Sequence, residues 1–295
     1  MRPLLLAIAV LAAVSSASSL AKQLQPEILP VLPPPPIVLA DQPAQASALD
    51  RILAGDWRSA ANKARDKYRH PRQTLEFFGV LPGQRVIEIW PGGGWYAEVL
   101  APLLAGHGSY TGVIPDPAVA EVAARQNTER NNQKLRDLFA ARKDVFGQAR
   151  LLAVDSAAPV LGPDASADVV LTFRNAHNWV MAGTERQMFK AFFAVLKPGG
   201  TLGLVDHRAR PDQPPAEMKS SGYLPEAYVI ALAQAAGFQL AGKSEINANP
   251  LDRKDYPDGV WTLPPRLAKG DQDREKYLAI GESDRMTLRF IKPTR

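Results

Sequence analysis

The chain has 295 residues, of which 46% are hydrophobic and 22% are charged, so it can bury the core of one large domain or two small ones. Lys and Arg number 35 against 30 Asp and Glu, and this net charge of +5 predicts no nucleic-acid partner. The sequence contains no cysteine, which excludes disulfide scaffolds, thiolate nucleophiles, iron–sulfur clusters and Cys-containing zinc sites.

The first 21 residues have the pattern of a secretory signal peptide. Arg2 precedes an apolar run over residues 4–14, and small residues then lead to Ala21, where cleavage is expected. The apolar run is about half of the roughly 20 residues that span a bilayer, so we expect no stable membrane anchor after cleavage. This interpretation predicts an exported protein, in the periplasm if the source is bacterial.

A proline-rich segment follows the signal peptide. Residues 22–46 contain PVLPPPPIVLADQP, in which prolines fix φ and remove backbone donors, so we expect a linker. One folded domain should then cover residues 47–295. Its first part, residues 47–80, is expected to form a helical cap with one or two helices over 48–69 and another over 73–78.

Strands and helices alternate after this cap. Short apolar runs predict strands over 85–90, 109–114, 149–154, 168–173 and 201–206, with helices up to 104, over 118–142 and over 185–196. A helix over 225–236, a strand over 238–246, a loop over 247–274 and a last strand over 286–291 complete the pattern. Such alternation predicts an α/β fold, with a Rossmann-like, mostly parallel sheet of seven strands and helices on both faces.

A glycine-rich turn follows the first strand. Gly92, Gly94 and Ala97 satisfy G-x-G-x-x-[G/A], and Asp116 lies 22 positions beyond Gly94, at the end of the next strand. Glycines let a ligand approach the backbone closely, and the following helix offers free N–H groups. These features admit a nicotinamide dinucleotide or an adenosyl ligand.

Two further features accompany this turn. Glu88 lies near the carboxyl end of the first strand, where a buried carboxylate is costly unless a cation or several N–H donors satisfy it. The segment LKPGG then precedes the fifth strand. With these motifs the chain resembles the class I S-adenosylmethionine-dependent methyltransferases. The segments EIWPGGGWYAEVLAPLL, FRNAHNW and DRMTLRFIKP resemble, more narrowly, a group of exported bacterial predicted methyltransferases.

The resemblance implies a methyltransferase that binds S-adenosylmethionine at the carboxyl edge of the first three strands and methylates a small molecule. It also implies that the last strand is antiparallel. By their places in the family's motifs, the cofactor-binding residues would be Glu88, Gly92, Gly94, Tyr96, Asp116, Asp155, Ser156 and Arg174. The family has a glycine where Trp90 stands, and the prolines beside Asp116 make a helix cap an alternative role for its carboxylate.

A second polar group follows the fourth and fifth strands, which should be neighbours. His177 or His207 could act as a general base, with Asp206 as its orienting partner and Asn175 in the same site. The two histidines and Asp206 could instead bind a metal, but no H-x-x-x-H or H-E-x-x-H spacing supports this and we predict none. In a third interpretation, Asn175 and Asn178 cap the next helix and the histidines bond backbone carbonyls.

The predicted loop over 247–274 is longer than usual connections, so Tyr256, Trp261 and Arg266, together with Tyr223, are candidates for lids over the cleft. Since S-adenosylmethionine is made in the cytoplasm, export raises the alternative of a catalytically silent protein that binds a ligand or partner. A second alternative is an NAD(P)-dependent oxidoreductase, which the LKPGG segment and the lack of an S-x(n)-Y-x-x-x-K arrangement disfavour. The sequence predicts neither the acceptor nor the oligomeric state.

Overall fold

The computed structural model describes residues 42–120 and 122–294, which belong to one compact unit, Leu39–Arg295. The predicted signal peptide and most of the predicted linker lie outside these residues, so export stays a prediction. Helix α1 (Gln42–Ala54) begins within the last five residues of that linker. Among the helices of the described ranges, none has the length and apolar character needed to cross a membrane.

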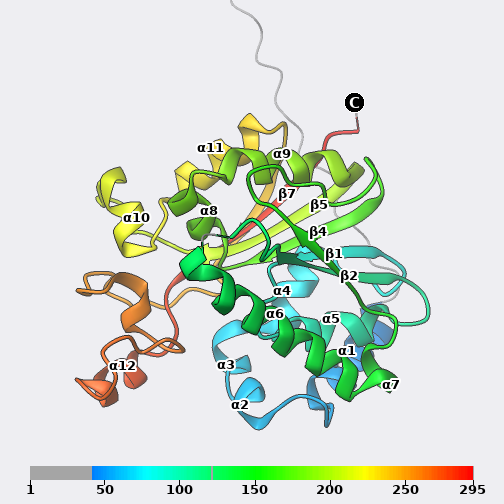
Figure 1. The fold of residues 1–295 in the computed structure, drawn as a ribbon, viewed down its shortest axis with the longest axis horizontal. Helices are drawn as coiled ribbons and strands as arrows, with labels where there is room; N and C mark the ends of the chain where they lie inside the picture. The colour runs from blue at the N-terminus through cyan, green and yellow to red at the C-terminus, as the bar shows by residue number, and fades with distance from the viewer. Residues whose placement is uncertain (1–41, 121, 295) are drawn as a thin grey trace, which may run out of the picture. The chain divides into compact units, whose positions relative to one another are not determined.

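Seven strands form one sheet in the order β3-β2-β1-β4-β5-β7-β6 (Figure 1). The strands are β1 (Arg85–Ile89), β2 (Ser109–Pro115), β3 (Arg150–Val154), β4 (Ala167–Phe173), β5 (Leu196–His207), β6 (Gln239–Ser244) and β7 (Arg285–Ile291). Strand β7 pairs antiparallel with β5 and β6, and the other pairings are parallel. The predicted fold class is therefore confirmed. The sheet differs from dinucleotide-binding sheets, whose strand order is 3-2-1-4-5-6, because antiparallel β7 is inserted between β5 and β6.

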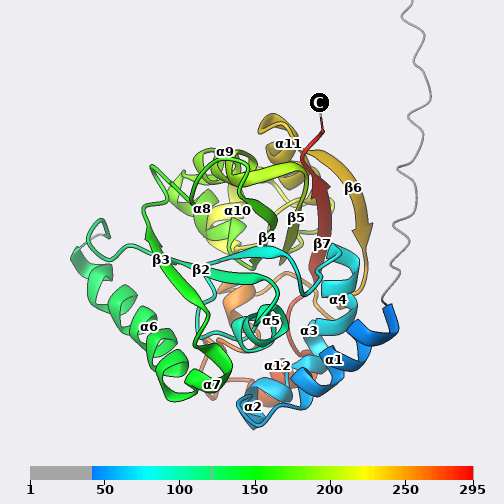
Figure 2. The same ribbon diagram turned by 90° about the vertical axis from the view of Figure 1, so that its right-hand side faces the viewer.

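Helices cover both faces of this sheet, as the two ribbon views show (Figures 1 and 2). One face carries α8 (Ala176–Ala182), α9 (Glu185–Val195) and α11 (Glu226–Ala235). The other carries α1, α4 (Pro71–Phe78), α5 (Ala97–Leu104), α6 (Val122–Ala141) and α7 (Lys143–Phe146). The remaining helical elements are α2 (Ala60–Lys63), α3 (Asp66–Arg69), η1 (Pro215–Glu217), α10 (Met218–Ser221), η2 (Gly259–Thr262) and α12 (Arg274–Ile280).

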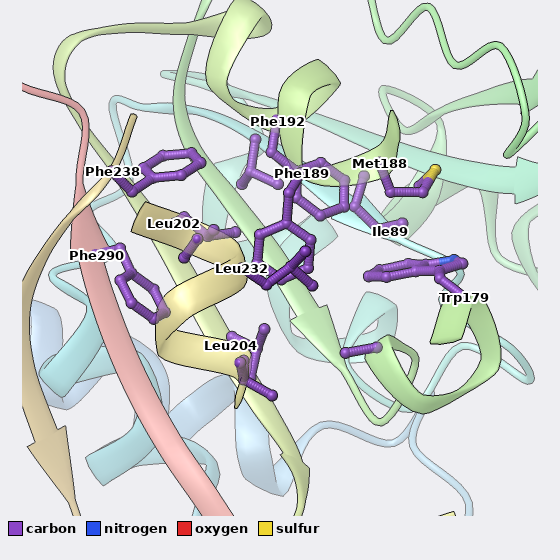
Figure 3. Packing of buried hydrophobic residues seen from close by; sticks show 14 of the residues in the cluster. Ile89, Trp179, Met188, Phe189, Phe192, Leu202, Leu204, Leu232, Phe238 and Phe290 are labelled. Carbon is purple, nitrogen blue, oxygen red and sulfur yellow. The ribbon is translucent and has the colours of Figure 1, made fainter. Parts of the chain in front are cut away.

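Each face of the sheet has its own hydrophobic core. Figure 3 shows the core beneath α8, α9 and α11, where Trp179 is fully buried and lies edge-on to Trp90 and Phe192, with ring centroids 5.6 and 5.4 Å away. Side chains alternate between faces along a strand, so Ile87 and Ile89 enter this core. Val86 enters the core beneath α1, α4 and α5, and the same alternation directs Glu88 to that face.

Several boundaries differ from the sequence prediction. Residues 48–69 form three helices rather than one or two, because a turn separates α2 from α3. The predicted helix over 118–142 is α6 followed by the separate α7, because Arg142 leaves helical geometry with φ −133° and ψ 66°. The LKPGG segment lies within β5, since the Gly199 N–H donates to the Lys292 carbonyl and the Lys292 N–H donates to the Gly200 carbonyl.

Short helices were also missed. Helix α8 follows β4, where the sequence pattern predicts no helix, and its Ala176, Trp179 and Val180 are buried. The predicted loop over 247–274 contains η2, and α12 follows it directly. With seven residues or fewer, these elements are too short to show a helical period in the sequence.

Candidate functional site

A pocket lies at the carboxyl ends of β1 and β4. The chain proceeds from β1 to β2 and β3 on one side of the sheet and from β4 to β5 on the other, so this edge is the switch point where ligands bind in open α/β sheets. The pocket has a volume of about 180 Å³. Three segments line it: Arg65 and Arg69 of the cap, the turn containing Trp90 and Gly92 after β1, and Arg174 with Asn175 after β4.

The backbone ends β1 and β4 in the same way. The Trp90 N–H donates to the Val113 carbonyl and the Arg174 N–H to the Val205 carbonyl, both at 2.7 Å. Trp90 and Arg174 then adopt left-handed φ values of 49° and 62°, which cost non-glycine residues about 1–3 kcal/mol each. Trp90 therefore adopts a backbone conformation that favours glycine, at a cost in strain.

The glycines of the turn have two different surroundings. A Cβ at Gly92 or Gly93 would meet no atom within 4 Å, and both residues line the pocket. A Cβ at Gly94 would lie 2.7 Å from a Leu138 methyl group and 3.0 Å from one of Leu135, beneath α6. Gly92 therefore lines the pocket, whereas Gly94 allows α6 to pack on the turn and does not line the pocket.

Glu88 lines the pocket and is 2% exposed. The Tyr110 hydroxyl donates to its carboxyl oxygen at 2.7 Å, and burial raises the pKa of Glu88 to about 8 against the opposing charge of Arg69. The buried carboxyl group is thus largely protonated at neutral pH. Tyr110 was not identified from the sequence. Gly112 was the available signal, because it pairs with Glu88 in the sheet and its missing side chain leaves space for the Tyr110 hydroxyl group.

A group of arginines surrounds the buried Glu282. Arg69 and Arg65 place their Nε atoms 3.0 and 2.7 Å from its carboxylate oxygens, and Nη1 of Arg285 lies 3.1 Å away. Burial lowers the pKa of Arg69 to about 9 and that of Arg174 to about 10. Burial alone would raise the pKa of Glu282, but the arginines hold it at about 2.

The predicted histidine group is assembled at the ends of α8 and β5. His177 Nδ1 lies 2.8 Å from Asp206 Oδ1, and the Asp206 carboxylate also accepts the backbone N–H groups of His177 and His207. The His207 ring centroid lies 4.9 Å from that of His177, and Ser283 Oγ lies 2.6 Å from its Nδ1. The alternative in which the histidines bond backbone carbonyls is therefore wrong.

Burial lowers the pKa of His207 well below its usual range, and the charges of His177 and Arg174 act in the same direction. The Nε2 atoms of both histidines have no hydrogen-bond partner within the described part of the chain. Candidate ligand atoms of His177, Asp206 and His207 lie within 4.8 Å of one another, a spacing that a metal ion could use. Asp206 already accepts three N–H groups, however, which suits an orienting role.

Asn175 joins the two strands that form the pocket. Its Nδ2 donates to the Ile89 carbonyl at 2.8 Å, and its side chain makes no capping bond to α8. The proposed capping role of Asn175 is therefore wrong. Tyr96 also lines the pocket, with its hydroxyl donating to the Arg69 carbonyl at 3.3 Å and its ring stacked on Phe173.

The predicted adenosine-binding residues lie away from this pocket. Asp116 and Asp155 follow β2 and β3, and each accepts a backbone N–H two residues later, from Ala118 at 2.9 Å and Ala157 at 2.8 Å. Neither these two carboxylates nor Ser156 line the pocket. Asp116 therefore closes a turn and does not cap a helix, since α6 begins at Val122. Each of the two carboxylates keeps one oxygen without a partner in residues 42–120 and 122–294.

The four candidate lid residues are also outside the pocket lining. Tyr223 is fully buried and donates its hydroxyl to Asp252 at 3.0 Å. The Trp261 ring lies 6.2 Å from the His177 ring, near the histidine pair. Arg65, Arg69 and Glu282 were not predicted as site residues, because the sequence separates these arginines from Glu282 by 217 and 213 positions.

No family model and no curated protein matches the chain. Among solved structures, an S-adenosylmethionine-dependent methyltransferase from Aquifex aeolicus is 15% identical over 78% of this chain and 93% of its own, with a TM-score of 0.52. The [4+2]-cyclase SpnF is 16% identical over 86% of this chain and 95% of its own, with a TM-score of 0.54. These similarities establish the methyltransferase-type fold, and the two descriptions name different reactions on it.

Proposed function

We propose that this chain is an S-adenosylmethionine-dependent methyltransferase that acts on a small molecule. The observation that carries the proposal is the open glycine turn: Gly92 and Gly93 face a pocket at the switch point, where added side chains would meet nothing. The His177–Asp206 pair is buried, and His177 is two residues beyond the pocket residue Asn175 in the chain. The fold supports the same proposal.

The residues present fit the proposed cofactor. Gly92, Gly93 and Tyr96 would hold its methionine end, because the bare backbone of the turn leaves room for a ligand. Asp116 and Asp155 would hold its adenosine end through their unpartnered oxygens at the ends of β2 and β3. When bound, S-adenosylmethionine supplies a methyl group that its sulfonium already activates, so the protein contributes mainly proximity and orientation.

The proposed proton acceptor is Nε2 of His177. Donation from Nδ1 to Asp206 at 2.8 Å leaves the lone pair on Nε2, which can then take a proton from the attacking group of the acceptor. Asp206 would stabilise the resulting imidazolium ion, and the two backbone N–H groups hold its carboxylate in place. His207 stays neutral because burial opposes its charged form.

Calorimetric titration with S-adenosylmethionine, S-adenosylhomocysteine and NAD tests the proposal. We expect both adenosyl ligands to bind and NAD not to bind. Gly93→Ala should weaken adenosyl binding, whereas Gly83→Ala is a matched control, because a Cβ at either glycine meets no atom within 4 Å. Binding of NAD alone would favour the oxidoreductase alternative, and no binding of any ligand would favour the silent protein.

A further inference from the structure

Three arginines line the pocket with unsatisfied donors. Nη2 of Arg65 and Nη2 of Arg69 are buried without a hydrogen-bond partner, and the Arg69 residue is only 4% exposed. The Arg174 side chain forms no hydrogen bond or ion pair with any residue that the structure describes. A buried charged donor without a partner is costly, so these groups need a ligand with acceptor atoms.

The charge near the pocket is also unbalanced. Three arginines line the pocket, Arg65, Arg69 and Arg174, and Glu88 is the one carboxyl group among its lining residues. The Glu282 carboxylate, which is bonded to Arg65 and Arg69, supplies one negative charge against these three positive charges and leaves an excess of +2. Glu88 adds little negative charge at neutral pH, because burial raises its pKa to about 8.

S-adenosylmethionine would not correct this excess. Its amino-acid end carries an ammonium group as well as a carboxylate, and its sulfonium adds a further positive charge. Even an ionised Glu88 would offset only one of these charges. A second ligand group that is negatively charged would offset this excess.

We propose that the methyl acceptor carries an oxyanion, a carboxylate or a phosphate, that binds to Arg65, Arg69 and Arg174. This inference rests on the proposed function, because it specifies the acceptor of that site. It assigns Arg174, which the family resemblance places with the cofactor, to the acceptor. The guanidinium groups suit an oxyanion, since their planar forks donate two parallel N–H bonds. Arg69 is also held in position before any ligand binds, stacked 4.7 Å from the Trp95 ring centroid and bonded to Glu282.

Calorimetric titration of the full chain with inorganic phosphate and with succinate tests the inference. The titrations are made at neutral pH and low ionic strength, with and without saturating S-adenosylhomocysteine. We expect one saturable site that weakens as salt is added, and the tighter of the two probes identifies the oxyanion. Arg174→Gln should weaken binding roughly 10- to 100-fold, the effect of losing a charge-assisted hydrogen bond.

Two further variants keep the test decisive. Arg65→Gln replaces Arg174→Gln should the latter not fold, and it should weaken binding to a similar extent. Arg253→Gln is the control, because the Arg253 side chain is 77% exposed and pairs only with Asp255 among the described residues. It should bind the probes as the unaltered chain does.

The outcomes separate this inference from the proposed function. Absence of saturable phosphate or succinate binding in the presence of S-adenosylhomocysteine, or binding that Arg174→Gln and Arg65→Gln leave unchanged, overturns the inference. If adenosyl ligands bind in that case, the proposed function still stands. Arginine-dependent binding of the probes without any adenosyl binding would establish the anion site and overturn the methyltransferase proposal.

Discussion

Replacing Glu88 by Gln should change how stability depends on pH. The pKa of Glu88 rises from 4.5 to about 8 on folding because the group is buried. Between these values the folded chain binds the proton and the unfolded chain has released it, so the free energy of unfolding decreases as pH rises. The decrease is about 1.4 kcal/mol per pH unit, or about 3 kcal/mol between pH 5.5 and pH 7.5.

Gln does not titrate, and its amide oxygen can still accept the Tyr110 hydroxyl. Between pH 5.5 and pH 7.5 the difference in the free energy of unfolding should therefore shift by about 3 kcal/mol in favour of Glu88→Gln. Urea unfolding of both proteins at pH 5.5, 6.5 and 7.5 measures the difference directly, because all other titrating groups cancel. Glu275→Gln, on the exposed surface of α12, is the control and should follow the unaltered chain. Parallel curves for Glu88→Gln and the unaltered chain would refute the protonated, buried carboxyl group.

Three other predictions follow from the same structure. His177→Asn and Asp206→Asn should each reduce kcat by about 100-fold or more while calorimetry shows unchanged adenosyl binding; full turnover on an identified acceptor would remove the pair from catalysis. Gly94→Ala should destabilise the fold by about 1–3 kcal/mol in urea, because its Cβ would lie 2.7 Å from Leu138, and an unchanged midpoint would contradict that packing. Trp179→Ala should cost about 3–5 kcal/mol, and a loss below about 1 kcal/mol would contradict its full burial.

The long elements of the fold were predictable from the sequence because each contributes a run or a periodic set of apolar residues to a hydrophobic core. The run RVIEI is buried at four of its five positions as β1, and the helix predicted over 185–196 buries Met188, Phe189 and Phe192 as α9. Short elements were not predictable. Helix α8 has a single apolar turn after polar residues, and its helical state depends on packing with the sheet rather than on local preference.

The candidate site was predictable where topology alone brings residues together. The glycine turn follows β1, and His177 and Asp206 follow or end the neighbouring strands β4 and β5. The arginine group was not predictable, because its partner Glu282 lies more than 200 residues from Arg65 and Arg69. Asp116 does not line this pocket, and one of its carboxylate oxygens accepts the N–H of its own turn.

The Glu282 carboxylate joins residues that the ribosome makes far apart in time. Arg65 precedes it by 217 residues, a delay on the order of 10–40 s at the usual 5–20 residues per second. During that interval Arg65 and Arg69 lack the carboxylate that positions them, and β7 is not yet available to complete the sheet. The residues that line the pocket are thus all made before the carboxylate that positions two of its arginines.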